Sequence, residues 1–162
     1  MKENKGNKKF NPVVYFVICL AVMLFADTYF TNIILHNIFI NTDNFNFLDI
    51  VYVQNTGAAF SSFQHATLLL SILSIFAIIF ILCELFRDIY KYTLPVYFSS
   101  AMLIAGVVCN TYERITLGYV RDYISFKFIE FPVFNISDVL INLGVIAILI
   151  LIVTKKYKRH DK

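Results

Sequence analysis

Asp122 and Asp138 are the two side chains of this sequence best suited to acid–base chemistry. Two carboxyl groups held close together cannot both ionise cheaply, so they share one proton and titrate as a unit. One member can then take a proton from a water molecule, while its neighbour protonates a carbonyl oxygen and later a departing amine. Such a pair can hydrolyse a peptide bond without a metal ion or a nucleophilic side chain. We therefore expect neither a metal ion nor a cofactor.

Each polar candidate also has a simpler explanation when it is taken alone. Asn135 can be the N-cap of a helix that carries Asp138 in its first turn. Asp122 can be a solvated strand residue, and Arg114 can extend its guanidinium to lipid headgroups. Asp27 is harder to explain in this way because it lies inside an apolar run. An ion pair between Asp27 and Arg114 is the structural interpretation that we favour.

The elements that must position these residues are four apolar segments. The chain has 162 residues, of which 59% are hydrophobic and 15% charged, whereas soluble domains are about half apolar and a quarter charged. Crossing a hydrocarbon core takes roughly 20 helical residues. We predict an all-α membrane protein, with one domain over residues 1–162 and four transmembrane helices at about 13–35, 66–84, 94–112 and 136–153.

The distribution of Lys and Arg predicts the orientation of these helices, because positive residues resist translocation. Residues 36–65 contain neither Lys nor Arg and should face away from the cytoplasm, followed on the same side by residues 113–137. Both termini are then cytoplasmic. We expect their basic clusters to bind lipid headgroups and not nucleic acid. These clusters are Lys2, Lys5, Lys8 and Lys9, and Lys155, Lys156, Lys158, Arg159 and Lys162.

The two outer segments show alternation of period two, which is typical of extended strands. We predict a small β-sheet at the extracytoplasmic membrane surface, with its aromatic side chains at headgroup depth. The alternating positions are Phe45, Phe47 and Asp49 in the first segment, and Val120, Asp122, Ile124, Phe126 and Phe128 in the second.

Helix geometry places the intramembrane polar residues at one depth. At 1.5 Å per residue, Asp27 lies roughly 22 Å and Asn110 roughly 24 Å along their helices, near the outer surface. Asn110 and Arg114 share a helix face, and Asn135 begins the fourth helix at the same level. The extended stretch that carries Asp122 can fold back over that start, which would bring the two carboxyl groups together.

The order of these motifs resembles the lipoprotein signal peptidase (type II signal peptidase) family over essentially the whole chain. The residues that carry the resemblance are Asp27, the run from Asn55 to Phe60 (NTGAAF), Asn110 to Arg114, Tyr119 to Ile124, and Phe134 to Asp138. The NTGAAF run is the most specific of them. Its Gly57, Ala58 and Ala59 leave room for close approach of a backbone or lipid chain.

The resemblance implies that Asp122 and Asp138 are the catalytic pair of a membrane aspartic endopeptidase. Such an enzyme removes the signal peptide from a diacylglyceryl-modified prolipoprotein by cutting just before the lipidated cysteine. The implied surroundings are the lipids of the bacterial cytoplasmic membrane, and we expect a monomer with its active site on the extracytoplasmic side. The implied substrate-binding or supporting residues are Asp27, Asn55, Gly57, Asn110, Arg114 and Asn135.

Several positions depart from the family pattern, although both carboxyl groups are retained. Thr31 stands in place of a lysine, Glu113 in place of an aspartate, Cys109 in place of a glycine and Arg121 in place of an apolar residue. An Arg121 side chain pointing at the pair would favour its ionised form. Two alternatives therefore stay open: an inactive paralogue that binds lipoproteins without cutting them, and a small transporter lined by intramembrane polar residues. The nearly unbroken apolar inner halves of the helices disfavour the transporter.

Overall fold

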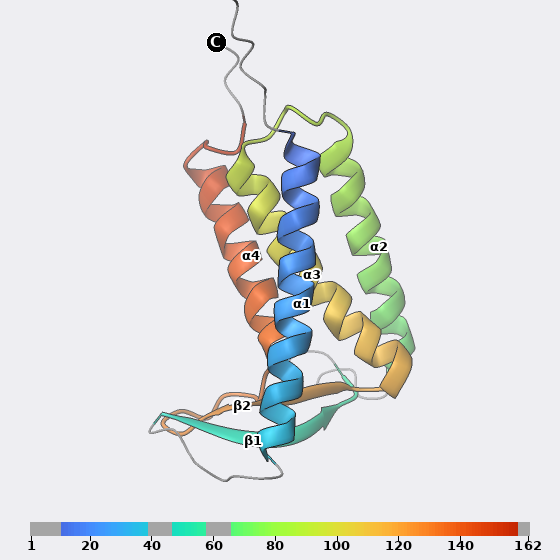
Figure 1. Cartoon of the computed structure of the whole chain (residues 1–162), viewed down its shortest axis with the longest axis vertical. Helices are drawn as coiled ribbons and strands as arrows, with labels where there is room; N and C mark the ends of the chain where they lie inside the picture. The colour runs from blue at the N-terminus through green and yellow to red at the C-terminus, as the bar shows by residue number, and fades with distance from the viewer. Residues whose placement is uncertain (1–10, 39–46, 58–65, 159–162) are drawn as a thin grey trace, which may run out of the picture.

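Helices run side by side along the long axis of the molecule, and a sheet lies across one end (Figure 1). The computed structural model describes residues 11–38, 47–57 and 66–158. Its helices are α1 (Pro12–Ile38), α2 (Thr67–Phe86), α3 (Leu94–Leu117) and α4 (Ile136–Val153). Its strands are β1 (Leu48–Asn55) and β2 (Val120–Phe126).

All four helices of the described residues are long and apolar enough to cross a membrane. Helices α1, α2 and α4 expose large apolar side chains along their outer faces, such as Phe25, Phe80 and Val153. This exposure would be unfavourable in water but suits a hydrocarbon environment. The predicted fold class, an all-α membrane protein with a small sheet, is therefore confirmed.

Helix α3 is the centre of the bundle. In the most apolar 18-residue stretch of α3, 56% of the residues are buried, compared with 11% in the corresponding stretch of each of the other three helices. Its inward positions include the small residues Ser99, Ser100, Ala101 and Ala105, which allow neighbouring helices to approach closely. Figure 1 shows α3 behind α1, with α2 and α4 on either side.

Gly106 permits the closest approach between α3 and the first turn of α4. A Cβ atom at this position would lie 2.3 Å from the carbonyl oxygen of Ser137 and 3.1 Å from the backbone nitrogen of Ile141. A side chain of any size would push the start of α4 away from α3. Since that turn carries Asp138, the missing side chain at Gly106 sets where this carboxyl group lies.

Helix α3 ends at Gly118, which adopts the left-handed conformation with φ 83°. Its backbone N–H donates to the carbonyl of Arg114 at 3.2 Å and closes the last turn. The helix therefore extends to Leu117, five residues beyond the end that the apolar pattern predicts. Glu113 and Arg114 consequently lie on regular helix, directly beneath the sheet.

The sheet is antiparallel and has a bulge beside Asp122. Ile50 pairs with Ile124 and Val53 pairs with Asp122, so β1 has one residue more than β2 between these pairs. Bulges redirect side chains and occur often next to active sites. Phe134 adds a short bridge to Ile124, with backbone hydrogen bonds of 2.8 and 3.0 Å. The predicted position Phe45 lies outside the described residues.

We expect Gly106→Ala to lower the free energy of unfolding by about 1–3 kcal/mol, because the added methyl group would overpack the contact between α3 and α4. Thermal unfolding in detergent measures the change. Ile115→Ala, on the exposed face of the same helix, is the control and should change stability far less. Equal stability of Gly106→Ala and the wild type would contradict the proposed close contact.

Candidate active site

Asp122 is buried in β2, with 2% of its surface exposed. Each of its carboxylate oxygens accepts a hydrogen bond from an asparagine amide. The donors are Nδ2 of Asn55 to Oδ2 and Nδ2 of Asn135 to Oδ1, both at 2.9 Å. Burial and these two bonds fix the direction of the carboxyl group.

Asp138 belongs to the capping box at the start of α4. Its backbone N–H donates to Oδ1 of Asn135 at 2.8 Å, and its Oδ2 accepts from the backbone N–H of Asn135 at 3.2 Å. Its other oxygen, Oδ1, accepts from Nδ2 of Asn110 at 2.8 Å. The carboxyl group is therefore held by α3 as well as by its own helix.

Asn135 connects the two carboxyl groups. Its Nδ2 donates to Asp122 and also to Oδ1 of Asn110, the latter at 3.1 Å, while its backbone N–H donates to Asp138. Asn110 and Asn135 are themselves 6% and 4% exposed. Two aspartates that are 16 positions apart in the sequence thus belong to one buried hydrogen-bonded cluster.

The loop after β1 is held against this cluster by Arg114. The Nη2 atom of Arg114 donates to the carbonyl of Gly57 at 3.0 Å, and the backbone N–H of Gly57 donates to Oδ1 of Asn55 at 2.9 Å. Because the side-chain oxygen of Asn55 accepts this hydrogen bond, its side-chain nitrogen is directed towards Asp122. The Nε atom of Arg114 is the one buried side-chain nitrogen or oxygen of the described residues that lacks a hydrogen-bond partner.

The pKa of Asp122 is raised to about 7, chiefly because the carboxyl group is buried. The negative charge of Asp138 contributes to this rise, whereas the hydrogen bonds from Asn55 and Asn135 and the positive charge of Arg114 partly oppose it. Near neutral pH the Asp122 carboxyl group therefore holds a proton for much of the time. A protonated acid beside a second carboxyl group is the arrangement that acid–base hydrolysis requires.

The predicted ion pair between Asp27 and Arg114 is wrong for the described structure. Asp27 is 5% exposed and accepts a hydrogen bond from Oγ of Ser137 at 2.8 Å. Arg114 points instead to the loop after β1. Asp27 thus supports the first turn of α4, and it contacts the residue before Asp138.

Arg121 and Tyr123 flank Asp122 and project from the other face of β2, as period-two alternation requires. Arg121 forms an ion pair with Glu113 and so does not extend to the carboxyl pair. The Tyr123 hydroxyl lies 2.7 Å from Oγ1 of Thr31 and accepts from the backbone N–H of Ile136. Strand alternation indicates that Tyr123 points away from Asp122, but nothing in the sequence identifies its partners.

Other sequence-based expectations concern residues away from this cluster. Ala58, Ala59 and Phe60 of the NTGAAF run lie outside the described residues. The three cysteines are free. Within the part of the chain that the structure describes, no group of three or more His, Cys, Asp or Glu side chains is arranged to bind a metal ion.

Comparisons with known proteins identify relatives over most of the chain. A family profile described as "Signal peptidase (SPase) II" matches residues 18–154. A lipoprotein signal peptidase of Lactobacillus gasseri is 32% identical over 151 residues, which cover 90% of this chain and 96% of the relative. One of Lactococcus lactis subsp. lactis is 34% identical over 144 residues, which cover 86% of this chain and 94% of the relative.

The fold is also similar to solved structures. A structure described as a bacterial membrane enzyme, determined by the in meso method at 2.3 Å resolution, superposes with a TM-score of 0.75 and 26% identity. The match covers 91% of this chain and 94% of that one. A second such structure, at 1.9 Å resolution, gives a TM-score of 0.70 with 26% identity and covers 85% and 91% of the two chains.

Asn135→Ala should lower the free energy of unfolding by about 2–4 kcal/mol, because the N-cap is lost and buried partners are left unpaired. Asn135→Ser should recover about 1 kcal/mol of this, since serine caps a helix but cannot extend to Asp122. Thermal unfolding in detergent compares the two variants. Asn142→Ala, at an exposed asparagine of the same helix, is the control. Equal stability of the Ala and Ser variants would contradict the capping role.

Proposed function

The chain belongs to the signal peptidase II family of aspartic-type membrane proteases, which process prolipoproteins, and we propose that Asp122 and Asp138 are its catalytic pair. The observation that carries this proposal is the shared asparagine. Asn135 donates hydrogen bonds to both carboxyl groups, and this places the aspartates in one cluster at the sheet end of the bundle. The hydrogen bonds to the two carboxyl groups come from Asn55, Asn110 and Asn135, all of which match the family pattern.

The two carboxyl groups have different surroundings, which suggests different roles in the reaction. Asp138 lies in the first turn of α4, where the helix dipole favours negative charge. It acts as the base and takes a proton from the attacking water. Asp122, with its raised pKa, acts as the acid and protonates the carbonyl oxygen of the scissile bond. When the tetrahedral intermediate collapses, Asp138 gives its proton to the departing amine, Asp122 regains a proton from a hydroxyl group of the intermediate, and the C–N bond breaks to release the signal peptide.

Arg114 supports the reaction from the last turns of α3. Its Nη2 atom is used to hold Gly57, whereas its buried Nε–H has no partner among the described residues. A buried donor without a partner is unfavourable. A carbonyl group of the bound substrate supplies that partner, so Arg114 orients the substrate backbone beside the carboxyl pair. Asn55, Gly57, Asn110 and Asn135 position the pair itself, and Asp27 positions the start of α4.

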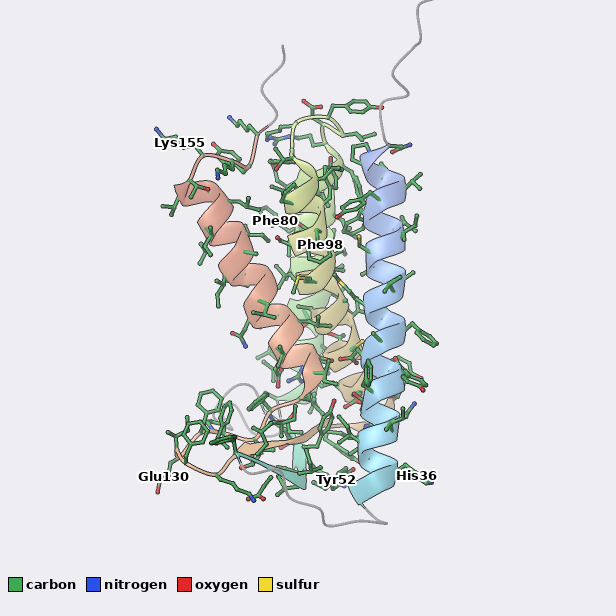
Figure 2. All side chains as sticks on the ribbon, turned by 60° about the vertical axis from the view of Figure 1, so that its left-hand side comes forward. His36, Tyr52, Phe80, Phe98, Glu130 and Lys155 are labelled. Atoms are coloured by element: carbon green, nitrogen blue, oxygen red, sulfur yellow. The ribbon has the colours of Figure 1, made fainter. Side chains whose placement is uncertain are left out.

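The substrate is a prolipoprotein whose cysteine carries a diacylglyceryl group, and the cut falls just before that cysteine. The carboxyl pair lies where the apolar helices meet the sheet, so the lipid chains stay in the bilayer while the peptide lies at its surface. In Figure 2, Tyr52 marks the sheet end and Lys155 the opposite end. The sheet end is extracytoplasmic and both termini are cytoplasmic in the bacterial cytoplasmic membrane. Basic residues at the other end, including Arg87, Lys91 and Lys155, support this orientation.

Asp122→Asn and Asp138→Asn should each abolish cleavage of a diacylglyceryl-modified precursor, because an amide can neither donate the required proton as an acid nor accept one as a base. Mass spectrometry of the new N-terminus measures cleavage of the modified precursor and of an unmodified one. Asp88→Asn, in the link between α2 and α3, is the matched control and should cleave normally. Activity in either catalytic variant, or cleavage at another bond, would overturn the assignment.

Cleavage should also decrease as the pH rises above about 7, because Asp122 then loses the proton that it must donate. The hydrogen bond from Asn55 stabilises the ionised form of Asp122 and so lowers its pKa. Asn55→Ala should therefore raise that pKa and move the decrease in kcat/KM to higher pH. Gln54→Ala, at the exposed neighbouring position, should leave the profile unchanged. A shift of the Asn55→Ala profile to lower pH would contradict the assignment of Asp122 as the acid.

A further inference from the structure

Glu113 and Arg121 form the most buried ion pair of the described residues. Oε1 of Glu113 accepts from Nε of Arg121 at 2.9 Å and from Nη2 at 2.6 Å. Oε2 of the same carboxylate accepts from the backbone N–H of Arg121 at 2.7 Å. The side chains of Glu113 and Arg121 are 13% and 27% exposed. One carboxylate of α3 thus binds both the main chain and the side chain of the residue directly before Asp122.

We propose that the Glu113–Arg121 ion pair is a positioning device, which fixes the start of β2 on α3 so that Asp122 points at Asn135 and Asp138. Arg121 and Asp122 project from opposite faces of the strand. If Arg121 is held on one face, the strand cannot rotate about its axis, and the direction of Asp122 on the other face is set. This inference rests on the proposed function, because it assigns a role in catalysis through Asp122.

The sheet alone is too small to supply this rigidity. Near the site its pairing consists of Val53 with Asp122, Gln54 with Arg121 and Asn55 with Val120, and a bulge separates these pairs from the next one. An isolated pair of strands is marginally stable at best. An anchor outside the sheet is therefore needed at the end of the strand where Asp122 lies.

Consecutive residues of α3 anchor both strands. Glu113 binds the backbone of Arg121 at the start of β2, and Arg114 binds the carbonyl of Gly57 just beyond the end of β1. These two points lie close together, because Asn55 pairs with Val120. The last turns of α3 thereby fix Asp122 and its hydrogen-bond donor Asn55 relative to each other.

A double-mutant cycle tests this role. Because misplacement of a reacting group by about 1 Å can reduce the rate about a hundredfold, we expect Glu113→Gln to lower kcat at least tenfold while KM stays within about twofold. Arg121→Met should have a smaller effect, since Glu113 still accepts from the backbone N–H of residue 121. The double variant should be no slower than Glu113→Gln alone, because both substitutions break one interaction.

Conservative and control variants separate positioning from general stability. Arg121→Lys keeps the ion pair, and its kcat should lie within about threefold of the wild-type value, in contrast to Arg121→Met. Lys127→Met breaks the other ion pair of the sheet, to Asp49 at 3.2 Å, and should leave kcat unchanged. The melting temperature of each variant in detergent shows whether a loss of rate merely follows a loss of fold.

The outcomes distinguish this inference from the proposed function. If the wild type cleaves the precursor and Asp122→Asn does not, the proposed function holds. Once the proposed function is established in this way, the positioning role is overturned if Glu113→Gln and Arg121→Met both retain the kcat of the wild type. Additive losses in the double variant, or equal loss in Arg121→Lys and Arg121→Met, overturn it as well. Retained cleavage in Asp122→Asn would instead refute the catalytic pair itself.

Discussion

The hydrogen bonds of Asn135 are the interaction on which the rest of the structure depends. One residue caps α4, donates to Asp122 on a strand, and donates through its backbone to Asp138 on a helix. Strand and helix must therefore meet at a fixed distance and angle. The close contact at Gly106 sets the height of α4 on α3, and the anchored end of β2 brings the strand to the same point.

The membrane environment explains why the polar residues form one connected cluster. Unpaired polar groups are unfavourable in a low-dielectric interior, and the buried amides and carboxyl groups of this site are bonded mainly to one another. The central position of α3 makes this possible, since it contributes Asn110, Glu113 and Arg114 within two turns. Away from the sheet, the other three helices present mainly apolar side chains, so the cluster lies where α3 meets the sheet.

Much of this arrangement follows from the sequence because it depends on periodicity. The lengths of the apolar runs predict the helices, alternation predicts the strands, and the spacing of Asn135 and Asp138 is typical of a helix start. Interactions that depend on direction around a helix axis are not predicted in this way. Asp27 and Arg114 lie at similar depth, yet they face different neighbours, so the ion pair expected between them does not form.

The end of α3 and the partner of Arg121 also could not be predicted. The apolar pattern stops near residue 112, whereas Gly118 ends the helix because it can adopt a positive φ. Glu113 and Arg121 each depart from the family pattern when taken singly. In the structure these two residues form an ion pair with each other. This shared contact becomes visible only once the strand is placed on the helix.

The chain order of the capping box has a consequence for biosynthesis. Asn135 and Asp138 belong to the final span, which leaves the ribosome after the other three helices and both strands. A nascent chain that has inserted three spans holds Asp122 but lacks its partner. On the proposal that Asp122 and Asp138 are the catalytic pair, the site is completed only when the fourth span has been inserted, so a chain that stops before that span lacks one of the two carboxyl groups.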